Sequence, residues 1–218
     1  MSLIRKTNYR FLSWFIRNTW KAIGGLEVQG IENFPRHGPC IVIANHQSYL
    51  DPLLINAVTP RILHSMAKST QFSGRFMGWW MPFIYTFPVR RYQTDPQAVR
   101  IVLRRLAAGE PVMIYVEGER TWDGRLQPPR LGTIRVLLKA GVPIIPVRID
   151  GAYDVWPRWH RKIRPGRITI RFGPSIRFPR LDSRADREAV LAEARDRIVA
   201  ALSGPLDHAD SEPPDPIG

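Results

Sequence analysis

Short apolar runs alternate with longer amphipathic segments along this chain. The runs are rich in valine and isoleucine and are bounded by turn residues, which is typical of buried strands. They predict strands at 26–30, 40–44, 62–67, 112–116, 143–149 and 167–172. Between them, apolar residues recur at helical spacing in a segment that opens at Asp95 and closes at Gly109, and in another that ends before Gly141. Together with a last helix over 185–202, this alternation predicts an α/β fold: a single domain with a mixed, largely parallel central sheet flanked by helices.

The segment 9–24 has a different pattern, because it mixes large aromatic and aliphatic residues with Arg10, Arg17 and Lys21 and contains no acidic residue. An amphipathic helix lying in a membrane interface has this composition: its rings sit at headgroup level and its basic side chains reach lipid phosphates. A helix that packs the same rings into the core is the alternative.

The formal net charge of the chain is +13, from 32 Lys and Arg against 19 Asp and Glu. This excess favours an anionic partner, which means nucleic acid, phospholipid headgroups or phosphorylated substrates. The single cysteine, Cys40, is expected in the core and rules out an intramolecular disulfide and a cysteine-based zinc site. The sequence has no cleavable signal and no apolar run of about 18 residues, so we expect the chain to stay on the cytosolic side.

Reactive side chains follow the apolar run 40–44, in the stretch 45–51 (Asn-His-Gln-Ser-Tyr-Leu-Asp). A neutral imidazole can take a proton from an attacking alcohol, and a carboxylate on its other nitrogen fixes the tautomer, so His46 and Asp51 form a candidate catalytic pair. Two accounts of the following helix start remain open: Asp51 as N-cap before Pro52, or a capping box between Ser48 and Asp51. The structural alternative is that Asp51 only caps a helix and His46 lies on the surface.

A second polar stretch, 117–121 (Glu-Gly-Glu-Arg-Thr), follows the apolar run 112–116. Gly118 lets the backbone approach a ligand closely, and the fork of Arg120 matches phosphate oxygens, so both suit an anionic group. Glu117 is expected either to accept a substrate hydroxyl or to hold Arg120. An ordinary polar loop with a surface salt bridge is the alternative.

Further basic residues, Lys68 and the pair Arg90 and Arg91, follow other apolar runs. Charges at loop ends are usually solvated, and only convergence on one pocket would make them phosphate ligands.

Four stretches, in this order and spacing, resemble the four conserved blocks of the glycerolipid acyltransferases, and most closely the lysophosphatidic acid acyltransferase group. They are 45–51, 87–91 (Phe-Pro-Val-Arg-Arg), 117–121 and 142–147 (Val-Pro-Ile-Ile-Pro-Val). The resemblance implies an enzyme that moves a fatty acyl group from acyl-CoA or acyl carrier protein to the free hydroxyl of a lysophospholipid, 1-acyl-sn-glycerol-3-phosphate first among them. It implies a direct transfer with no metal, no further cofactor and no acyl-enzyme.

The resemblance also assigns roles to residues. His46 is the implied base and Asp51 its orienting partner. The implied substrate-binding residues are Arg91 of the second block, three residues of the third block (Glu117, Gly118 and Arg120), and Lys68, which matches a lysine after the second strand of the domain. Arg120 is the residue implied to bind the acceptor phosphate.

Departures from the family pattern concern the acceptor. Glu119 stands where the family usually has threonine, Val116 where it usually has proline, and Arg90 where it often has aspartate. A carboxylate beside Arg120 weakens its field on a phosphate. A different lysolipid, such as an amino-acid-linked lipid, therefore stays open as the acceptor.

Other chemical roles also depend on aromatic and backbone groups. Five aromatic residues suit an acyl-chain slot, the core or membrane contact alike: Phe72, Phe76, Trp79, Trp80 and Phe83. Backbone N–H groups near Ile145 or at the Asp51 helix start are candidate donors to the oxyanion.

Two rival functions come from other classes. Basic residues interleave with Trp156 and Trp159 over 156–167, which is compatible with nucleic-acid binding, although no nucleic-acid motif is present and we expect no such partner. A non-catalytic protein that binds anionic lipids is the second rival, and the retained His46 and Asp51 argue against it.

The expected organisation is an interfacial helix at 1–25, an acyltransferase domain at 26–202 and a disordered tail at 203–218. The tail is rich in proline and acidic residues and has no Lys or Arg. We expect peripheral or monotopic association with the cytoplasmic side of the cell membrane.

Overall fold

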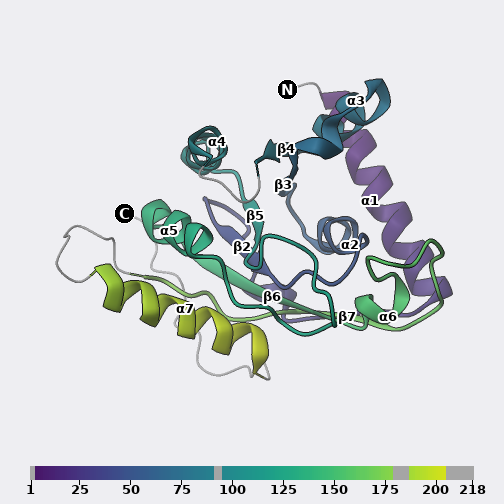
Figure 1. Cartoon of the computed structure of the whole chain (residues 1–218). Helices are drawn as coiled ribbons and strands as arrows, with labels where there is room; N and C mark the ends of the chain where they lie inside the picture. Colours follow the sequence, from purple (N-terminus) through teal and green to yellow (C-terminus); the bar gives the residue numbers. More distant parts are fainter. Residues whose placement is uncertain (1–2, 91–94, 179–186, 205–218) are drawn as a thin grey trace.

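A seven-stranded sheet forms the centre of the computed structural model, which describes residues 3–90, 95–178 and 187–204 (Figure 1). The strand order is β1-β7-β6-β2-β5-β3-β4, and every neighbouring pair is parallel except β6 and β7. The predicted mixed, largely parallel sheet is therefore confirmed. The strands are β1 (Leu26–Gln29), β2 (Ile41–Ala44), β3 (His64–Lys68), β4 (Thr86–Val89), β5 (Val112–Tyr115), β6 (Ile144–Asp150) and β7 (Ile168–Phe172).

Helices cover both faces of the sheet and complete the predicted α/β domain. One face carries α1 (Leu3–Ile23), α2 (Asp51–Val58) and the short α6 (Ala152–Val155); the other carries α4 (Pro96–Ala107), α5 (Leu131–Ala140) and α7 (Arg187–Ser203) (Figure 1). Residues of β2 alternate between the two cores: Val42 and Ala44 pack on the side of α2, and Ile41 and Ile43 on the side of α5. This alternation follows from the two-residue period of a strand that is buried on both faces.

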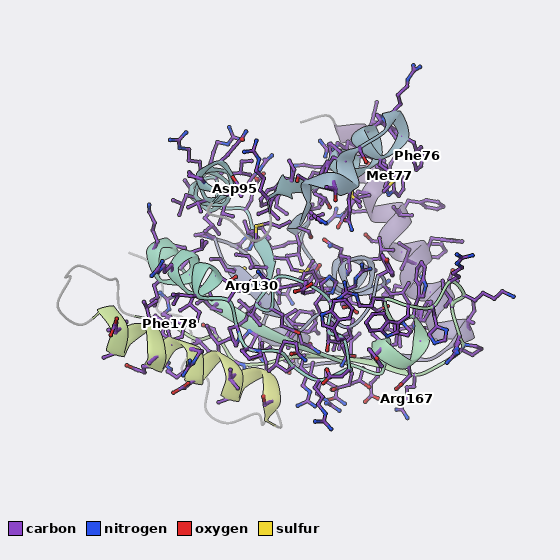
Figure 2. The ribbon with its side chains drawn as sticks, in the orientation of Figure 1. Phe76, Met77, Asp95, Arg130, Arg167 and Phe178 are labelled. Atoms are coloured by element: carbon purple, nitrogen blue, oxygen red, sulfur yellow. The ribbon has the colours of Figure 1, made fainter. Side chains whose placement is uncertain are left out.

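Strand β4 and helix α3 (Arg75–Phe83) were not predicted as elements. β4 lies at the edge of the sheet, where Pro88 is tolerated because its missing N–H faces no further strand. None of the nine residues of α3 is buried, and Phe76 is 66% exposed. Figure 2 shows Phe76 and Met77 at the upper end of the molecule, away from the sheet.

Helix α1 begins at Leu3, earlier than predicted, and divides its aromatic residues between two environments. Tyr9 and Trp20 are buried against the domain, whereas Phe11, Trp14 and Phe15 are more than half exposed. The packing interpretation therefore describes one face of α1, and the interfacial interpretation of the exposed face stays a prediction. Among the described residues, no helix is both long and apolar enough to cross a membrane.

The parallel strands bring the candidate chemistry to one edge of the sheet. β2 and β5 pair in register with Ala44 opposite Tyr115, so the residues that follow, His46 and Glu117, leave the sheet side by side. β3 pairs with β5 and ends at Lys68 at the same edge. We call this the carboxyl edge; the first residues of the same strands form the amino edge. Cys40, just before β2, is fully buried, as expected. The tail beyond residue 204 lies outside the described residues.

Candidate active site

His46 and Asp51 are in direct contact at the carboxyl edge. Nδ1 of His46 lies 2.7 Å from Oδ2 of Asp51, with 9% of the His46 side chain and none of the Asp51 side chain exposed. His46 follows β2, and Asp51 is the first residue of α2, so the six-residue turn at 45–50 between strand and helix brings the pair together. The imidazole is therefore neither on the open surface nor sealed in the core.

The carboxylate of Asp51 also organises the turn that carries His46. Its Oδ2 accepts hydrogen bonds from the backbone N–H groups of Gln47 at 2.6 Å and Ser48 at 2.7 Å. Leu50 is the N-cap of α2, so neither predicted account of the helix start holds in full. The bond from the Ser48 N–H to Asp51 is one half of a capping box, whereas the Ser48 hydroxyl accepts from the N–H of Leu50 at 3.2 Å. Three N–H groups of the turn are thus already engaged, which leaves them poorly placed to bind an oxyanion.

Tyr115 packs flat against the imidazole of His46 and was not recognised from the sequence. The two ring centroids are 3.8 Å apart and the planes differ by 13°. Burial, and then the negative charge of Asp51, hold the pKa of Tyr115 well above its ordinary value, so the phenol stays neutral. Its position as the last residue of β5, two residues before Glu117, was the available signal. The stack fixes the plane in which His46 can meet a substrate.

Glu117 holds the backbone of His46 rather than projecting into open space. Its carboxylate accepts hydrogen bonds from the N–H of His46 at 2.8 Å and the N–H of Gln127 at 3.2 Å, and the residue is 3% exposed. Burial raises the pKa of Glu117 to about 7, and the two N–H groups counteract part of that rise. This geometry makes Glu117 a positioning residue for His46; contact with a substrate hydroxyl stays a prediction.

Gly118 has the backbone conformation that only glycine adopts easily, with φ of +73°. A Cβ at this position would lie 2.6 Å from the side chain of Arg130, whose Nε donates to the carbonyl of Glu117 at 2.8 Å. Arg130, near the start of α5, is labelled in Figure 2. Gly118 is therefore required for the close packing of an arginine on the loop, and the sequence did not single out Arg130.

Glu119, the departure from the family pattern, forms ion pairs with two arginines. Its carboxylate lies 3.0 Å from Nη2 of Arg130 and 3.8 Å from Nη1 of Arg158. The guanidinium of Arg158 also lies 3.4 Å from the ring centroid of Trp122. The expected weakening of Arg120 by Glu119 stays a prediction, because the described ion pairs of Glu119 involve other cations.

Arg120 stacks on Tyr49, an aromatic residue of the first polar stretch, 45–51. Its guanidinium carbon lies 3.3 Å from the centroid of Tyr49, and Tyr49 in turn lies 5.1 Å from the ring of Trp156. The N–H of Thr121 donates to the carbonyl of His46 at 2.8 Å, which ties the two loops together. A cation is thus held beside the loop that carries the catalytic candidate.

Two other predicted binding residues are less well placed by contacts. Lys68 ends β3 at the same edge and is partly buried, and no described residue forms an ion pair with it. Arg91 lies outside the described residues. The structure therefore brings together His46, Asp51, Glu117, Gly118 and Arg120, and leaves the roles of the other two as predictions.

The arrangement can perform proton transfer beside a loop that carries a positively charged side chain. Asp51 faces Nδ1 of His46, which leaves Nε2 as the ring nitrogen able to accept a proton from a hydroxyl. Tyr115 fixes the ring, Glu117 fixes its backbone, and Arg120 provides positive charge in the adjacent loop. A positioned base of this kind can take the proton of a hydroxyl as that hydroxyl attacks an acyl carbonyl.

Comparisons with known proteins agree with this geometry. The chloroplastic 1-acyl-sn-glycerol-3-phosphate acyltransferase BAT2 of Brassica napus is 28% identical over 200 residues, which cover 87% of this chain and 56% of that protein. The 1-acyl-sn-glycerol-3-phosphate acyltransferase of Bacillus subtilis (strain 168) is 24% identical over 204 residues, covering 91% of this chain and 98% of the relative. The chain spans about half the length of the plant chloroplast relatives that it matches.

A solved structure shares the fold. The crystal structure of the 1-acyl-sn-glycerophosphate (LPA) acyltransferase PlsC from Thermotoga maritima matches with a TM-score of 0.72 at 24% identity, over 88% of this chain and 78% of that one. The family model described as Acyltransferase matches residues 25–150, which include both polar loops of the site. Because this match covers more than half of the chain, the protein belongs to the acyltransferase family.

Proposed function

We propose that this protein transfers a fatty acyl group from acyl-CoA or acyl carrier protein to the free hydroxyl of a lysophospholipid at a membrane surface. The observation that carries the proposal is the 2.7 Å contact between His46 and the fully buried Asp51 at the carboxyl edge of the sheet. The acceptor expected first is 1-acyl-sn-glycerol-3-phosphate, because relatives of the chain bear the names of enzymes that act on it.

The reaction is a direct displacement at a thioester. Nε2 of His46 takes the hydroxyl proton as the acceptor oxygen attacks the acyl carbonyl, a C–O bond forms, the C–S bond breaks, and the thiolate leaves and takes up the proton. Asp51 stabilises the imidazolium that forms between the two halves of the step. Holding thioester and hydroxyl together makes a two-body reaction effectively unimolecular, and the stacked Tyr115 supports that alignment.

Positive charge near His46 supports a phosphate-bearing acceptor. Arg120 is held over Tyr49 beside the catalytic loop, and Lys68 ends β3 at the same edge of the sheet. Glu119 offsets part of the charge of Arg130 and Arg158, so an acceptor with less negative charge stays the second candidate.

Exposed apolar side chains support action at a membrane. Phe11 and Phe15 on α1, and Phe76 and Trp79 on α3, are each more than half exposed. Large exposed aromatic residues beside basic ones suit the headgroup layer of a bilayer. The proposal is peripheral association on the cytoplasmic side, with the acceptor taken from the bilayer and the donor from water.

The test is product identification with purified protein. Vesicles that contain a panel of lysolipids are incubated with acyl-CoA or acylated carrier protein, and the products are identified by mass. We expect His46→Ala to abolish transfer while circular dichroism and vesicle binding stay unchanged. His37→Ala, which removes an exposed histidine of another loop, is the matched control and should keep full activity. Substantial turnover by purified His46→Ala would refute the assignment of the base.

A further inference from the structure

A second candidate binding site lies at the amino edge of the sheet, opposite to His46. A cavity of about 510 Å³ opens between α1 and α2 and reaches His64 at the start of β3 and Pro111 before β5. His46 follows the carboxyl end of β2, the strand next to β5 in the sheet. A strand of four or five residues spans roughly 15 Å, so this cavity is separate from the catalytic residues.

Among the residues that the structure describes, four Lys and Arg side chains and one carboxylate line the cavity. Lys6, Arg10 and Arg17 come from α1, and Arg61 comes from the loop after α2. Among the described residues, no carboxylate forms an ion pair with any of these four. The wall therefore carries positive charge that the described part of the protein leaves uncompensated.

The other charged groups of the cavity are already engaged. Glu110 is the acid in its lining, and its Oε2 lies 3.0 Å from Nε2 of His64 and 3.1 Å from Nη1 of Arg105. Arg61 is held in place by hydrogen bonds from its guanidinium to three backbone carbonyls, those of Pro35, Gly38 and Gly109. One fixed cation and three cations on a helix thus face a cavity whose carboxylate has its own partners.

The sequence of α1 explains why the cations line one side of the cavity. Positions 6, 10, 13 and 17 recur at three- and four-residue spacing, so they form a stripe along the helix. This stripe lies between the buried face with Tyr9 and Trp20 and the exposed apolar face with Phe11 and Phe15. Trp14 lines the cavity and stacks on Phe11 with ring centroids 6.0 Å apart, so an apolar surface leads directly out of it.

We propose that this cavity binds the phosphate headgroup of an anionic phospholipid, whose acyl chains pass along Trp14 to the exposed face of α1. The cations would form charge-assisted hydrogen bonds to the phosphate, and the exposed apolar face of α1 would contact the acyl chains of the lipid. A free phosphate would use the cations but would gain nothing from the adjoining rings. The inference rests on the proposed function only for the membrane setting, since it concerns a bound lipid that is not the reacting acceptor.

The experiment compares binding of the full chain to two kinds of vesicle. One contains phosphatidylcholine alone and the other contains phosphatidylglycerol as well, at equal ionic strength. Arg17→Gln removes a charge from the cavity wall, and Lys21→Gln removes one from the next turn of the same helix, outside the cavity. A basic side chain at an anionic surface contributes roughly five-fold to partitioning. We therefore expect Arg17→Gln to lower partitioning onto the anionic vesicles at least about five-fold, and Lys21→Gln to lower it less than about 2.5-fold.

A larger change sharpens the comparison. The triple variant Lys6→Gln, Arg10→Gln and Arg17→Gln should lower partitioning onto the anionic vesicles by on the order of 100-fold and leave the weak binding to phosphatidylcholine unchanged. The matched control removes three exposed charges from α4 and α5 and should lose far less: Arg100→Gln, Arg104→Gln and Arg135→Gln. Glutamine is a good helix former, and unchanged thermal melting verifies that each variant is folded.

Two results would overturn the proposal. Equal losses for Arg17→Gln and Lys21→Gln would show diffuse attraction of the whole helix without a discrete site. Calorimetric binding of inorganic phosphate that Arg17→Gln abolishes, with no change in vesicle binding, would assign the cavity to a soluble ligand. Because the readout is binding and not turnover, the inference can fail while acyl transfer stands, and the His46→Ala assay can fail while this site stands.

Discussion

Replacing Glu117 by glutamine tests whether a buried carboxyl group holds the catalytic loop. Glu117 is 3% exposed, and its oxygens accept hydrogen bonds from the N–H groups of His46 and Gln127. The amide of Glu117→Gln keeps the shape and one acceptor but removes the ionisable group. The variant therefore isolates the titration of one carboxyl from every other group in the protein.

The magnitude follows from the raised pKa of Glu117. Burial moves this pKa from 4.5 to about 7, so the folded protein binds the proton more tightly than the unfolded chain does. The stabilisation is then complete below the unfolded pKa and is lost as the pH rises through the folded one. Linkage over this range gives a loss of about 2.5 kcal/mol in the free energy of unfolding between roughly pH 5 and pH 8.

The assay is urea unfolding of wild type and Glu117→Gln at several pH values across this range. All other titrations are common to the two proteins, so the difference between the two free energies reports Glu117 alone. We expect wild type to lose about 2 to 3 kcal/mol relative to the variant as the pH rises. A difference that does not change with pH would refute the titration of a buried Glu117 near neutral pH.

Three further changes probe the turn, the glycine and the proposed membrane face of α1. Asp51→Asn should lower acyl transfer on the order of 10²- to 10⁴-fold in steady-state assays, because the orienting carboxylate is lost while the fold persists. Gly118→Ala should lower the free energy of unfolding by about 1 to 3 kcal/mol in urea titrations, since φ is +73° and a Cβ meets Arg130. Phe11→Ser with Phe15→Ser should cost about ten-fold or more in vesicle flotation but less than about 0.5 kcal/mol per site in stability, because both rings are exposed.

Each of these three predictions can be contradicted by a specific result. Asp51→Asn with near wild-type turnover would remove the orienting role, and equal stability of Gly118→Ala would mean that the loop relaxes freely. Unchanged vesicle binding of the double serine variant would show that α1 is not the membrane face. Far-ultraviolet circular dichroism of each variant separates these results from global unfolding.

The sequence predicted what depends on neighbours along the chain. His46 and Asp51 are five positions apart along the chain. Because parallel strands end at one edge of a sheet, the sequence also predicted that the second polar stretch lies beside them. The aromatic and basic composition of α1 anticipated its exposed face. Strand β4 was missed because its four residues include a proline, which a central strand excludes but an edge strand tolerates.

The contacts that the sequence did not predict cross the sheet. The N–H of His46 donates to a carboxylate 71 positions away, and the ring of Tyr115 stacks on His46 from the neighbouring strand. Both follow from the register that sets Ala44 opposite Tyr115, which no local pattern encodes. The partners of Glu119 likewise depend on where α5 and the loop after α6 return to the site.

These cross-strand contacts give the polar stretch 117–121 a second role. The N–H of His46 donates to the carboxylate of Glu117, and the carbonyl of His46 accepts from the N–H of Thr121. The stretch 117–121 therefore holds the backbone of His46 through both its N–H and its carbonyl. Gly118 lies between these two anchors and allows the loop to turn tightly against Arg130. The stretch that the sequence predicts to be an anion-binding loop therefore also holds the backbone of His46, the proposed base, in position in the folded protein. We therefore expect substitutions within it to change the alignment of His46 as well as any affinity for the proposed acceptor.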